Sequence, residues 1–583
     1  MRRALIATAA GLALADAAVV TLALPQILLQ LDTSVEGVAA VIGVYTAVLV
    51  VGLPLSAALH NRATGAAGAL LFAAASIGCA SSNSLELLLV MRALQALGAS
   101  ALLAAAFDAI EGGGAGRRLW LGAAVAGTAA GPALGGALTE LFDWRAIFVA
   151  QAPIALAAAP ALVASPIATV HERLPRLPRD LVAGAALGLL SGAMTAVVFL
   201  LVLLLISGWA IDPLAAAATV TVLPLAALGG STIRGEPRAR ALAGCLLVAG
   251  GIGGLAFVPQ ASALWTIGPQ LLAGFGIGLA LPAIAGEMLP ERTRGEAAAL
   301  LSVRHAGITV ALLVLAPIVA AKLDDQVQLA KERGTAVVLD AKLPPTDKIE
   351  LAPRLFAEIE TDQPRAALRK AVKRERRRLT HGNQDLASRL SRLGRQLGIQ
   401  GDLAGKLGGL AGGLNGLLGG GEQSAASVGA GIDDLGDDLD DVVLAAVRSA
   451  FSPAFAVTGA MALLAALLLL LRGPPRTTLV GVALALAIAL PAAYALAYSS
   501  LRVKPVVIAD PCKAREHSSA SGLEGFVEDI ALRGLDRAAC RYGSSREELV
   551  LALFDDKSRR DYEHEHGIDP RRLDSVLKGM FGL

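Results

Sequence analysis

The sequence predicts an all-α, polytopic membrane protein, and three observations lead to this fold class. Hydrophobic residues make up 55% of the 583 positions and charged residues only 17%, whereas soluble domains carry about 25% charged residues. Apolar runs close to the length of about 20 residues that crosses a bilayer as a helix recur along the chain. Glycine is frequent, at 63 residues, as expected where helices pack closely in lipid.

Thirteen apolar runs qualify, or nearly qualify, as membrane spans. The first six are Leu5–Gln30, Val38–Leu59, Ala66–Ala80, Leu85–Ile110, Leu119–Leu138 and Ile147–Val163. The next five are Leu181–Ile206, Leu214–Leu228, Ala241–Val258, Leu264–Ile284 and Ala297–Ala320. The last two, Phe455–Leu471 and Leu479–Leu496, follow a long polar region. Although Arg2 and Arg3 precede the first run as in a signal peptide, no clear cleavage site follows, so we expect it to be retained.

These runs divide the chain into seven parts. We expect an N-terminal six-helix bundle at 1–165, a cytoplasmic linker at 166–180 and further spans at 181–322. An external insertion follows at 323–450, and the twelfth span lies at 451–472. An extra span at 477–499 and a small helical tail at 502–583 complete the chain.

Basic residues in the short loops predict the orientation of the chain. They gather at the N-terminus and in one set of alternating loops: Arg2, Arg3, Arg62, Arg117, Arg118, Arg173, Arg176, Arg179, Arg234, Arg238, Arg240, Arg292, Arg294, Arg472 and Arg476. The opposite short loops carry almost no positive charge, with Arg145 as the exception. We therefore expect a plasma (inner) membrane protein with a cytoplasmic N-terminus. The odd number of spans places the insertion and the C-terminus on the extracytoplasmic side.

The fifth run carries the most informative packing pattern. Its small residues recur at roughly one-turn spacing: Gly127, Gly131, Gly135 and Gly136. Such spacing leaves a helix face free of side chains, which another helix can approach closely. Pro132 removes a backbone donor and makes a soft point in the helix. The pattern predicts a tightly packed, bendable transmembrane helix, and ordinary close packing of two spans is the simpler interpretation.

Ionisable side chains inside spans are costly and are functional candidates. Asp16 lies inside the first span, and Arg92 begins the fourth, with Gln95 one turn further on the same face. A carboxylate buried in lipid can gain and lose a proton near neutral pH. Asp16 therefore either pairs with Arg92 or titrates against it, with structural pairing or snorkelling as the alternative.

The external insertion combines three patterns. A basic, helix-like run occupies Arg369–Arg378, and leucines follow at helical spacing between residues 386 and 417. Glycines between 401 and 421 weaken that helix, so either a loose helical hairpin or a partly disordered loop is expected. Aspartates between 433 and 441 lack the spacing of a calcium loop, and we expect them in the first turn of the helix that enters the twelfth span.

The tail is predicted to be a small helical unit with a cross-link. Ser545 and Glu548 have capping-box spacing ahead of an apolar run. Cys512 and Cys540 would share an oxidising compartment, so a disulfide is expected. The alternative is a zinc site, with candidate ligands His517, His564 and His566. Their spacing matches no zinc pattern, so no metal is predicted.

Several motifs resemble those of the drug/proton antiporter group of the major facilitator superfamily. The resembling segments are Asp16–Pro25 in the first span, Arg92–Gly98 in the fourth, Gly127–Gly136 in the fifth, Asp143–Pro153 at the sixth and Pro290–Arg304 before and within the eleventh. The resemblance implies proton coupling through Asp16, Arg92 and Gln95. It also implies two six-helix bundles around a central cavity, for which Tyr45, Ser191 and Thr195 are candidate polar groups.

One loop departs from the family pattern Gly-x-x-x-Asp-Arg-x-Gly-Arg. The chain has Ala57 at the first glycine, Asn61 at the aspartate and Thr64-Gly65 near the end. We expect this change to weaken the charge cluster that holds the outward-facing state in the family. The extra span, the external insertion and the tail match no family motif.

The predicted function is secondary active transport, with proton-coupled export of small lipophilic compounds by alternating access. Partners are then the compound, protons and the bilayer, together with an envelope partner for the insertion. Export of a lipid or envelope precursor, or a non-transporting sensor or scaffold, are the alternatives. The sequence shows no nucleophile triad, phosphate loop or metal cluster, so we expect no enzyme activity, no cofactor and no nucleic-acid partner.

Overall fold

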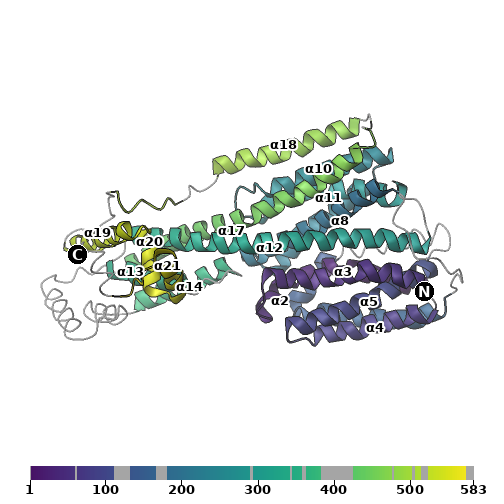
Figure 1. The fold of residues 1–583 in the computed structure, drawn as a ribbon, viewed down its shortest axis with the longest axis horizontal. Coiled ribbons are helices and arrows are strands. Elements are labelled where there is room, and N and C mark those ends of the chain that lie inside the picture. The colour runs from purple at the N-terminus through teal and green to yellow at the C-terminus, as the bar shows by residue number, and fades with distance from the viewer. Residues whose placement is uncertain are drawn as a thin grey trace. The chain divides into compact units, whose positions relative to one another are not determined.

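The computed structural model describes residues 2–59, 62–110, 131–165, 180–288, 293–341, 345–356, 363–381, 425–473, 475, 478–501, 506–513 and 523–572. The fold of these ranges is helical, with no strand within them (Figure 1). The chain forms two compact units. Unit 1 comprises Met1–Leu323 and Arg448–Arg502, and unit 2 comprises Asp324–Val447 and Val503–Leu583.

The first bundle of unit 1 contains α1 (Arg2–Thr21), α2 (Leu24–Gln30), α3 (Val35–Ala58), α4 (Arg62–Ala80), α5 (Leu85–Ile110), a helix at 131–141 and α7 (Arg145–Val163). The first predicted span is divided here, because Pro25 stands at the start of α2, where its missing N–H costs nothing. Buried alanines and leucines of α1, α3, α4, α5 and α7 form one core. Small side chains therefore let these helices pack closely.

The second bundle is formed by α8 (Leu181–Val202) with a π-helical turn at Leu203–Gly208, α9 (Pro213–Ser231), α10 (Pro237–Leu255), α11 (Ala263–Pro282) with a π-helical turn at Ala283–Met288, α12 (Arg294–Asp340) and α17 (Ala425–Leu470). The extra span, α18 (Thr478–Leu501), packs against α10. Its Tyr494 hydroxyl donates to the carbonyl of Trp265 at 2.8 Å. The extra helix therefore lies on the outside of the second bundle.

Twelve helices among the described residues are long and apolar enough to cross a membrane. They correspond to twelve of the thirteen predicted runs. The remaining run, Leu119–Leu138, is described only from residue 131, where the chain is helical. The prediction of an all-α, multi-pass membrane protein is confirmed.

Two helices are longer than the sequence predicts. The eleventh span was expected to end at Ala320, but α12 continues to Asp340, and α17 begins at Ala425, ahead of the expected start at 451. Buried apolar residues continue at helical spacing beyond both spans: Leu323, Val327 and Ala330 in α12, and Leu435, Leu439, Val443 and Ala446 in α17. This spacing gives each extension an apolar face to bury.

Unit 2 adds α13 (Pro345–Phe356), α14 (Pro364–His381), α19 (Leu523–Tyr542), α20 (Arg546–Phe554) and α21 (Asp556–His566) to those extensions. Two arginines of the basic run in α14 pair with aspartates of α17, Arg369 with Asp440 at 3.2 Å and Arg376 with Asp433 at 3.0 Å. Arg365 forms a two-pronged ion pair with Asp440, at 2.8 and 2.7 Å. The aspartates therefore lie inside α17, not in its first turn as expected. Leucines near 386–417 lie outside the described residues.

The tail has the two local features that the sequence analysis singled out. The capping box is present, since the Ser545 side chain accepts from the Glu548 N–H and the Glu548 carboxylate accepts from the Ser545 N–H. A disulfide joins Cys512 to Cys540, whose Cα atoms are 5.0 Å apart. Buried side chains of α19, α20 and α21 form a core together with Leu339 of α12, so the helices of the tail pack on one another and on the end of α12.

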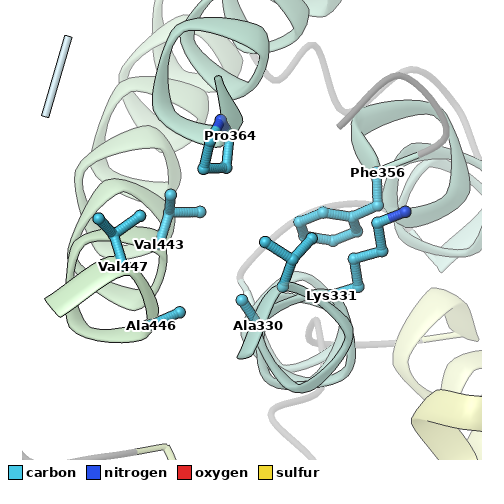
Figure 2. Close-up of a pocket in the computed structure, with 8 residues that line it drawn as sticks. Ala330, Lys331, Phe356, Pro364, Val443, Ala446 and Val447 are labelled. Atoms are coloured by element: carbon cyan, nitrogen blue, oxygen red, sulfur yellow. The ribbon is translucent and has the colours of Figure 1, made fainter. Parts of the chain in front are cut away.

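Unit 2 contains a small apolar cavity between α12, α13, α14 and α17 (Figure 2). Phe356, Val443 and Val447 line it, with the stem of Lys331 at its edge. Its volume is about 10 Å³, room for about one water molecule. The cavity is therefore too small to be a substrate site.

Close approach of α8 and α12 requires glycine, which gives a test of the second bundle. A Cβ on Gly307 would overlap the backbone carbonyl of Gly188. We predict that Gly307→Val forces the two helices apart and costs about 1–3 kcal/mol, measured as a lower Tm of the purified protein. The control is Gly481→Val in α18, where nothing lies within 4 Å. Equal Tm values for the two variants would contradict this packing.

Candidate functional site

Asp16 of α1 and Arg92 of α5 form an ion pair inside the first bundle. Arg92 Nη2 lies 2.5 Å from Asp16 Oδ2, and both side chains are fully buried. Neither charge reaches solvent, so each stabilises the other in surroundings where an isolated charge is costly. The first-span and fourth-span candidates from the sequence are thus brought together by the structure.

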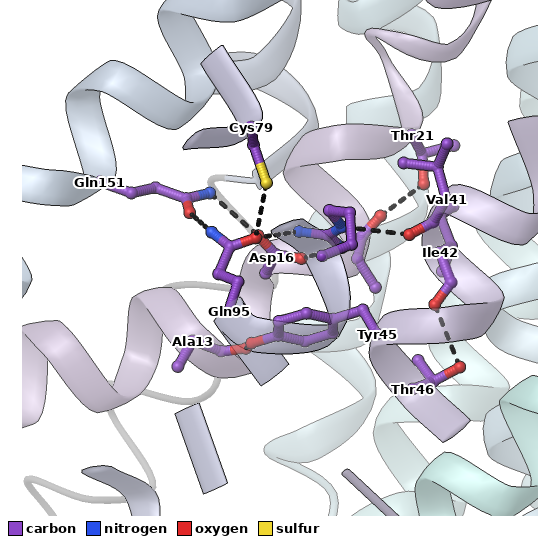
Figure 3. Close-up of polar contacts among 12 residues, drawn as sticks. Ala13, Asp16, Thr21, Val41, Ile42, Tyr45, Thr46, Cys79, Gln95 and Gln151 are labelled. Carbon is purple, nitrogen blue, oxygen red and sulfur yellow. Dashed lines mark hydrogen bonds and ion pairs between the residues drawn. The ribbon is translucent and has the colours of Figure 1, made fainter. Parts of the chain in front are cut away.

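Two amides close this pair into a ring, seen in Figure 3. Arg92 Nη1 donates to Gln95 Oε1 at 2.6 Å, and Gln95 Nε2 donates to Gln151 Oε1 at 2.8 Å. Gln151 Nε2 in turn donates to Asp16 Oδ1 at 3.0 Å. Both carboxylate oxygens are therefore occupied, one by a cation and one by an amide. We call Asp16, Arg92, Gln95 and Gln151 the Asp16 ring.

The ring is held in place by groups on α3 and α4. Arg92 Nε donates to the Val41 carbonyl at 3.1 Å, and Gln95 Nε2 also donates to Ser76 Oγ at 2.8 Å. The Arg92 guanidinium lies 4.3 Å from the centroid of the Tyr45 ring, an attractive cation–π geometry. The Tyr45 hydroxyl donates to the Ala13 carbonyl at 2.9 Å (Figure 3). Tyr45 is therefore buried against the ring, and its predicted role as a cavity group stays a prediction.

The two other cavity candidates lie in the second bundle. Ser191 is fully buried in α8, and Thr195 follows one turn later, 9% exposed. Within the described residues, no hydrogen bond joins either side chain to the Asp16 ring, and Ser191 Oγ has no hydrogen-bond partner. The structure therefore does not unite these two residues with the proton-coupling candidates.

The fifth-span glycines face two helices at once. Gly127 lies outside the described residues, while Gly131, Pro132, Gly135 and Gly136 fall in the helix at 131–141. A Cβ on Gly135 would overlap the carbonyl of Val19 in α1, one turn beyond Asp16. A Cβ on Gly136 would overlap the Ala217 side chain in α9. This helix thus packs between the first span and a helix of the second bundle.

Polar contacts also join the two bundles directly. Thr46 Oγ1 of α3 and Thr309 Oγ1 of α12 are 2.9 Å apart. At one end of the same two helices, Arg294 Nε donates to the Ala57 carbonyl at 3.0 Å, and its Nη1 lies 2.5 Å from Asp108 Oδ2. Asn61, where the loop departs from the family pattern, lies outside the described residues. The Arg294–Asp108 pair is therefore an inter-bundle contact that the sequence analysis did not predict.

Unit 2 holds one group of metal-type ligands among its described residues. Ligand atoms of Glu548, Glu565 and His566 lie within 4.8 Å of one another. His566 Nε2 is 2.9 Å from Glu548 Oε1, and Glu548 is already used in the capping box. Two of the three side chains are therefore paired with each other. His517 lies outside the described residues.

A comparison with models of protein families assigns the chain to a family. A family model described as Major Facilitator Superfamily matches residues 6–312, more than half of the 583 positions. The chain belongs to the Major Facilitator Superfamily. This superfamily member is therefore a multi-pass membrane transporter and not an enzyme, and the resemblance carried by the span motifs is confirmed.

Curated relatives of this facilitator include resistance and export proteins. The multidrug resistance protein Stp of Mycobacterium tuberculosis (strain CDC 1551 / Oshkosh) is 33% identical over 163 residues, which cover 26% of this chain and 30% of Stp. The tetracenomycin C resistance and export protein of Streptomyces glaucescens is 31% identical over 221 residues, 35% of this chain and 40% of that protein. The matched segments thus span less than half the length of either relative.

Solved structures show a distant likeness to the same facilitator. A bacterial homolog of the human lysosomal transporter Spinster, in an inward-facing conformation, has a TM-score of 0.48 and 14% identity, over 81% of this chain and 98% of its own. A D-xylose–proton symporter has a TM-score of 0.41 and 15% identity, over 54% of this chain and 88% of its own.

Sequence reasoning missed Gln151 in this facilitator. The residue stands inside the apolar run Ile147–Val163 and is almost fully buried, at 1% exposure. An amide within a span needs hydrogen-bond partners, and this was the available signal. Nothing in the sequence shows which span faces it, so its contact with Asp16 required the structure.

The ion pair makes a specific prediction about stability. Arg92→Met leaves the Asp16 carboxylate without its cation, and removing one partner of a buried pair costs about 3–5 kcal/mol. The double variant Asp16→Asn/Arg92→Met removes both charges, so its loss of stability should be smaller than that of Arg92→Met alone. The measurement is Tm of purified protein for both variants and Asp16→Asn. A double-variant loss equal to the sum of the single losses would show that the pair contributes nothing.

Proposed function

We propose that this facilitator exports small lipophilic compounds across the plasma membrane in exchange for protons, by alternating access. The observation that carries the proposal is the Asp16 ring, a closed circuit that holds one buried carboxylate against one buried guanidinium. Other support comes from its relatives, one of which is named a multidrug resistance protein and another a resistance and export protein.

Proton binding would act on the ring through charge. Protonation of Asp16 removes the negative charge that faces Arg92, and the loss of one partner from a buried pair costs about 3–5 kcal/mol. A change of that size alters the ratio of two conformations more than about a hundredfold. A proton taken up outside and released inside would thus bias the protein between its two open states.

The helix at 131–141 offers the route from the ring to the bundle interface. It packs on Val19, one turn from Asp16, and on Ala217 of α9. A shift of α1 that follows the rearrangement of the ring would press on the carbonyl contact at Gly135. Because this contact has no spare volume, we infer that the helix moves with α1 and changes the packing against α9.

We further infer that Arg294 and Asp108 hold the bundles together at the end predicted to be cytoplasmic. The pair joins α5 of the first bundle to α12 of the second. This ion pair would compensate for the missing negative charge at Asn61, where the family pattern has an aspartate. Transport is therefore favoured over the sensor or scaffold alternative, which had rested on the weakened loop.

Export of a lipid or envelope precursor is the second candidate. The observation that favours it is that α12 and α17 extend beyond their apolar spans into unit 2. We infer that unit 2 lies outside the cytoplasm, where an envelope partner would meet it. Drug export and precursor export share the mechanism proposed for the Asp16 ring and differ in the role of unit 2.

Compound susceptibility tests the proposal. In an efflux-deficient host that accumulates a panel of cationic, neutral and anionic lipophilic dyes (ethidium, Nile red and fluorescein), the intact chain should reduce accumulation of at least one dye and protect growth against toxic compounds of the same charge class. Asp16→Asn should lose this protection at equal expression, because the side chain can no longer exchange a proton.

The matched control is Asp32→Asn, a carboxylate in the loop after α2 at a positive φ of 46°, which asparagine tolerates. This variant should protect as the intact chain does. Undiminished protection by Asp16→Asn would remove the proton role. Absence of protection by the intact chain, despite its presence in the membrane, would shift the assignment to the second candidate.

A further inference from the structure

Arg304 places a guanidinium inside a membrane span. It lies ten residues after Arg294 in α12, about 15 Å further along the helix, and five residues before Thr309, which contacts Thr46 in α3. The predicted span, Ala297–Ala320, places seven residues before it and sixteen after it. Arg304 is thus too deep for its position to be explained by a helix end.

Arg304 differs from other arginines of unit 1 in its partners. Arg92 pairs with Asp16, Arg240 with Glu287 and Arg294 with Asp108. Within the part of the chain that the structure describes, Arg304 takes part in no ion pair, and its buried Nε has no hydrogen-bond partner. A charge at membrane depth without a partner is costly, so a role in binding would explain why it is retained.

The surroundings of Arg304 place it beside the junction of the two bundles. Val303 and Gly307 pack against Gly188 of α8, while Leu301 packs against the core of the first bundle. Successive residues of a helix are about 100° apart, so Arg304 lies on the sector of α12 between these two faces. The guanidinium therefore stands where the second bundle meets the first.

A second polar group without a partner lies on the neighbouring helix. Ser191 falls between Gly188, which lies against Val303 and Gly307 of α12, and Gly192, which lies against Gly307 and Ala311. Its hydroxyl is buried and has no hydrogen-bond partner in the described ranges. A cationic donor and a hydroxyl donor thus lie on adjoining helices, within about two turns of each other.

We infer that Arg304 and Ser191 bind an oxyanion, a carboxylate or phosphate group, on an otherwise lipophilic transported compound. The inference rests on the proposed export function and names its substrate class. A guanidinium binds such groups through two parallel N–H···O bonds, and the Ser191 hydroxyl can donate a third. The polar groups of the Asp16 ring are occupied by one another, whereas Arg304 has no ion-pair partner among the described residues and can bind the compound.

Equilibrium binding tests this assignment without a proton gradient. The full chain in phosphatidylcholine nanodiscs is titrated with 1-pyrenebutyrate, its neutral amide and the cationic 1-pyrenebutyltrimethylammonium. The carboxylate should bind at least about tenfold more tightly than the amide. Arg304→Gln should weaken carboxylate binding about tenfold or more and leave amide binding unchanged. Arg304→Lys keeps the positive charge but lacks the two parallel N–H donors of a guanidinium, so it should retain part of the preference for the carboxylate over the amide.

Arg238→Gln, an exposed arginine of the same bundle, controls for the change in net charge and should bind as the intact chain does. Equal affinity for carboxylate and amide, absence of carboxylate binding, or a preference that survives Arg304→Gln would each overturn the inference. Nanodiscs that also contain phosphatidylglycerol provide a separate arm, in which loss of carboxylate binding would reassign the site to a bilayer lipid. Because no gradient is present, failure here is distinct from failure of the dye-export test.

Discussion

The pairing of Asp16 with Arg92 is the interaction on which the first bundle depends. Neither charge is exposed to solvent, and a lone charge at that depth would destabilise the bundle by several kcal/mol. The amides of Gln95 and Gln151 complete the coordination, and Tyr45 covers the guanidinium. Five polar side chains from four helices thus satisfy one another inside an alanine-rich core.

Small residues connect this ring to the remainder of unit 1. The glycines of the helix at 131–141 lie against the backbone of Val19 in the first bundle and against the side chain of Ala217 in the second. Gly188 and Gly307 lie against each other between α8 and α12. Helices in such contact cannot move independently, because a tightly packed interface has discrete arrangements. We therefore propose that movement at the ring and movement at the bundle junction occur together.

The sequence predicted the class of fold well because span length and composition are local properties. Asp16, Arg92 and Gln95 were found for a related reason, since a polar residue in an apolar run is conspicuous by itself. Their mutual geometry, the role of Gln151 and the Asp108–Arg294 contact depend on which helices are neighbours, which periodicity does not reveal. The extensions of α12 and α17 were missed because polar faces masked their continuing apolar spacing.

Asp16 is proposed to carry the transported proton, and a measurement of proton movement tests this role most directly. Purified protein is reconstituted into liposomes that contain the pH indicator pyranine, and a lipophilic compound that the intact chain exports from cells is added on one side without an imposed gradient. We predict a proton movement opposite to that of the compound for the intact chain and none for Asp16→Asn. A proton signal of equal size in both would contradict it.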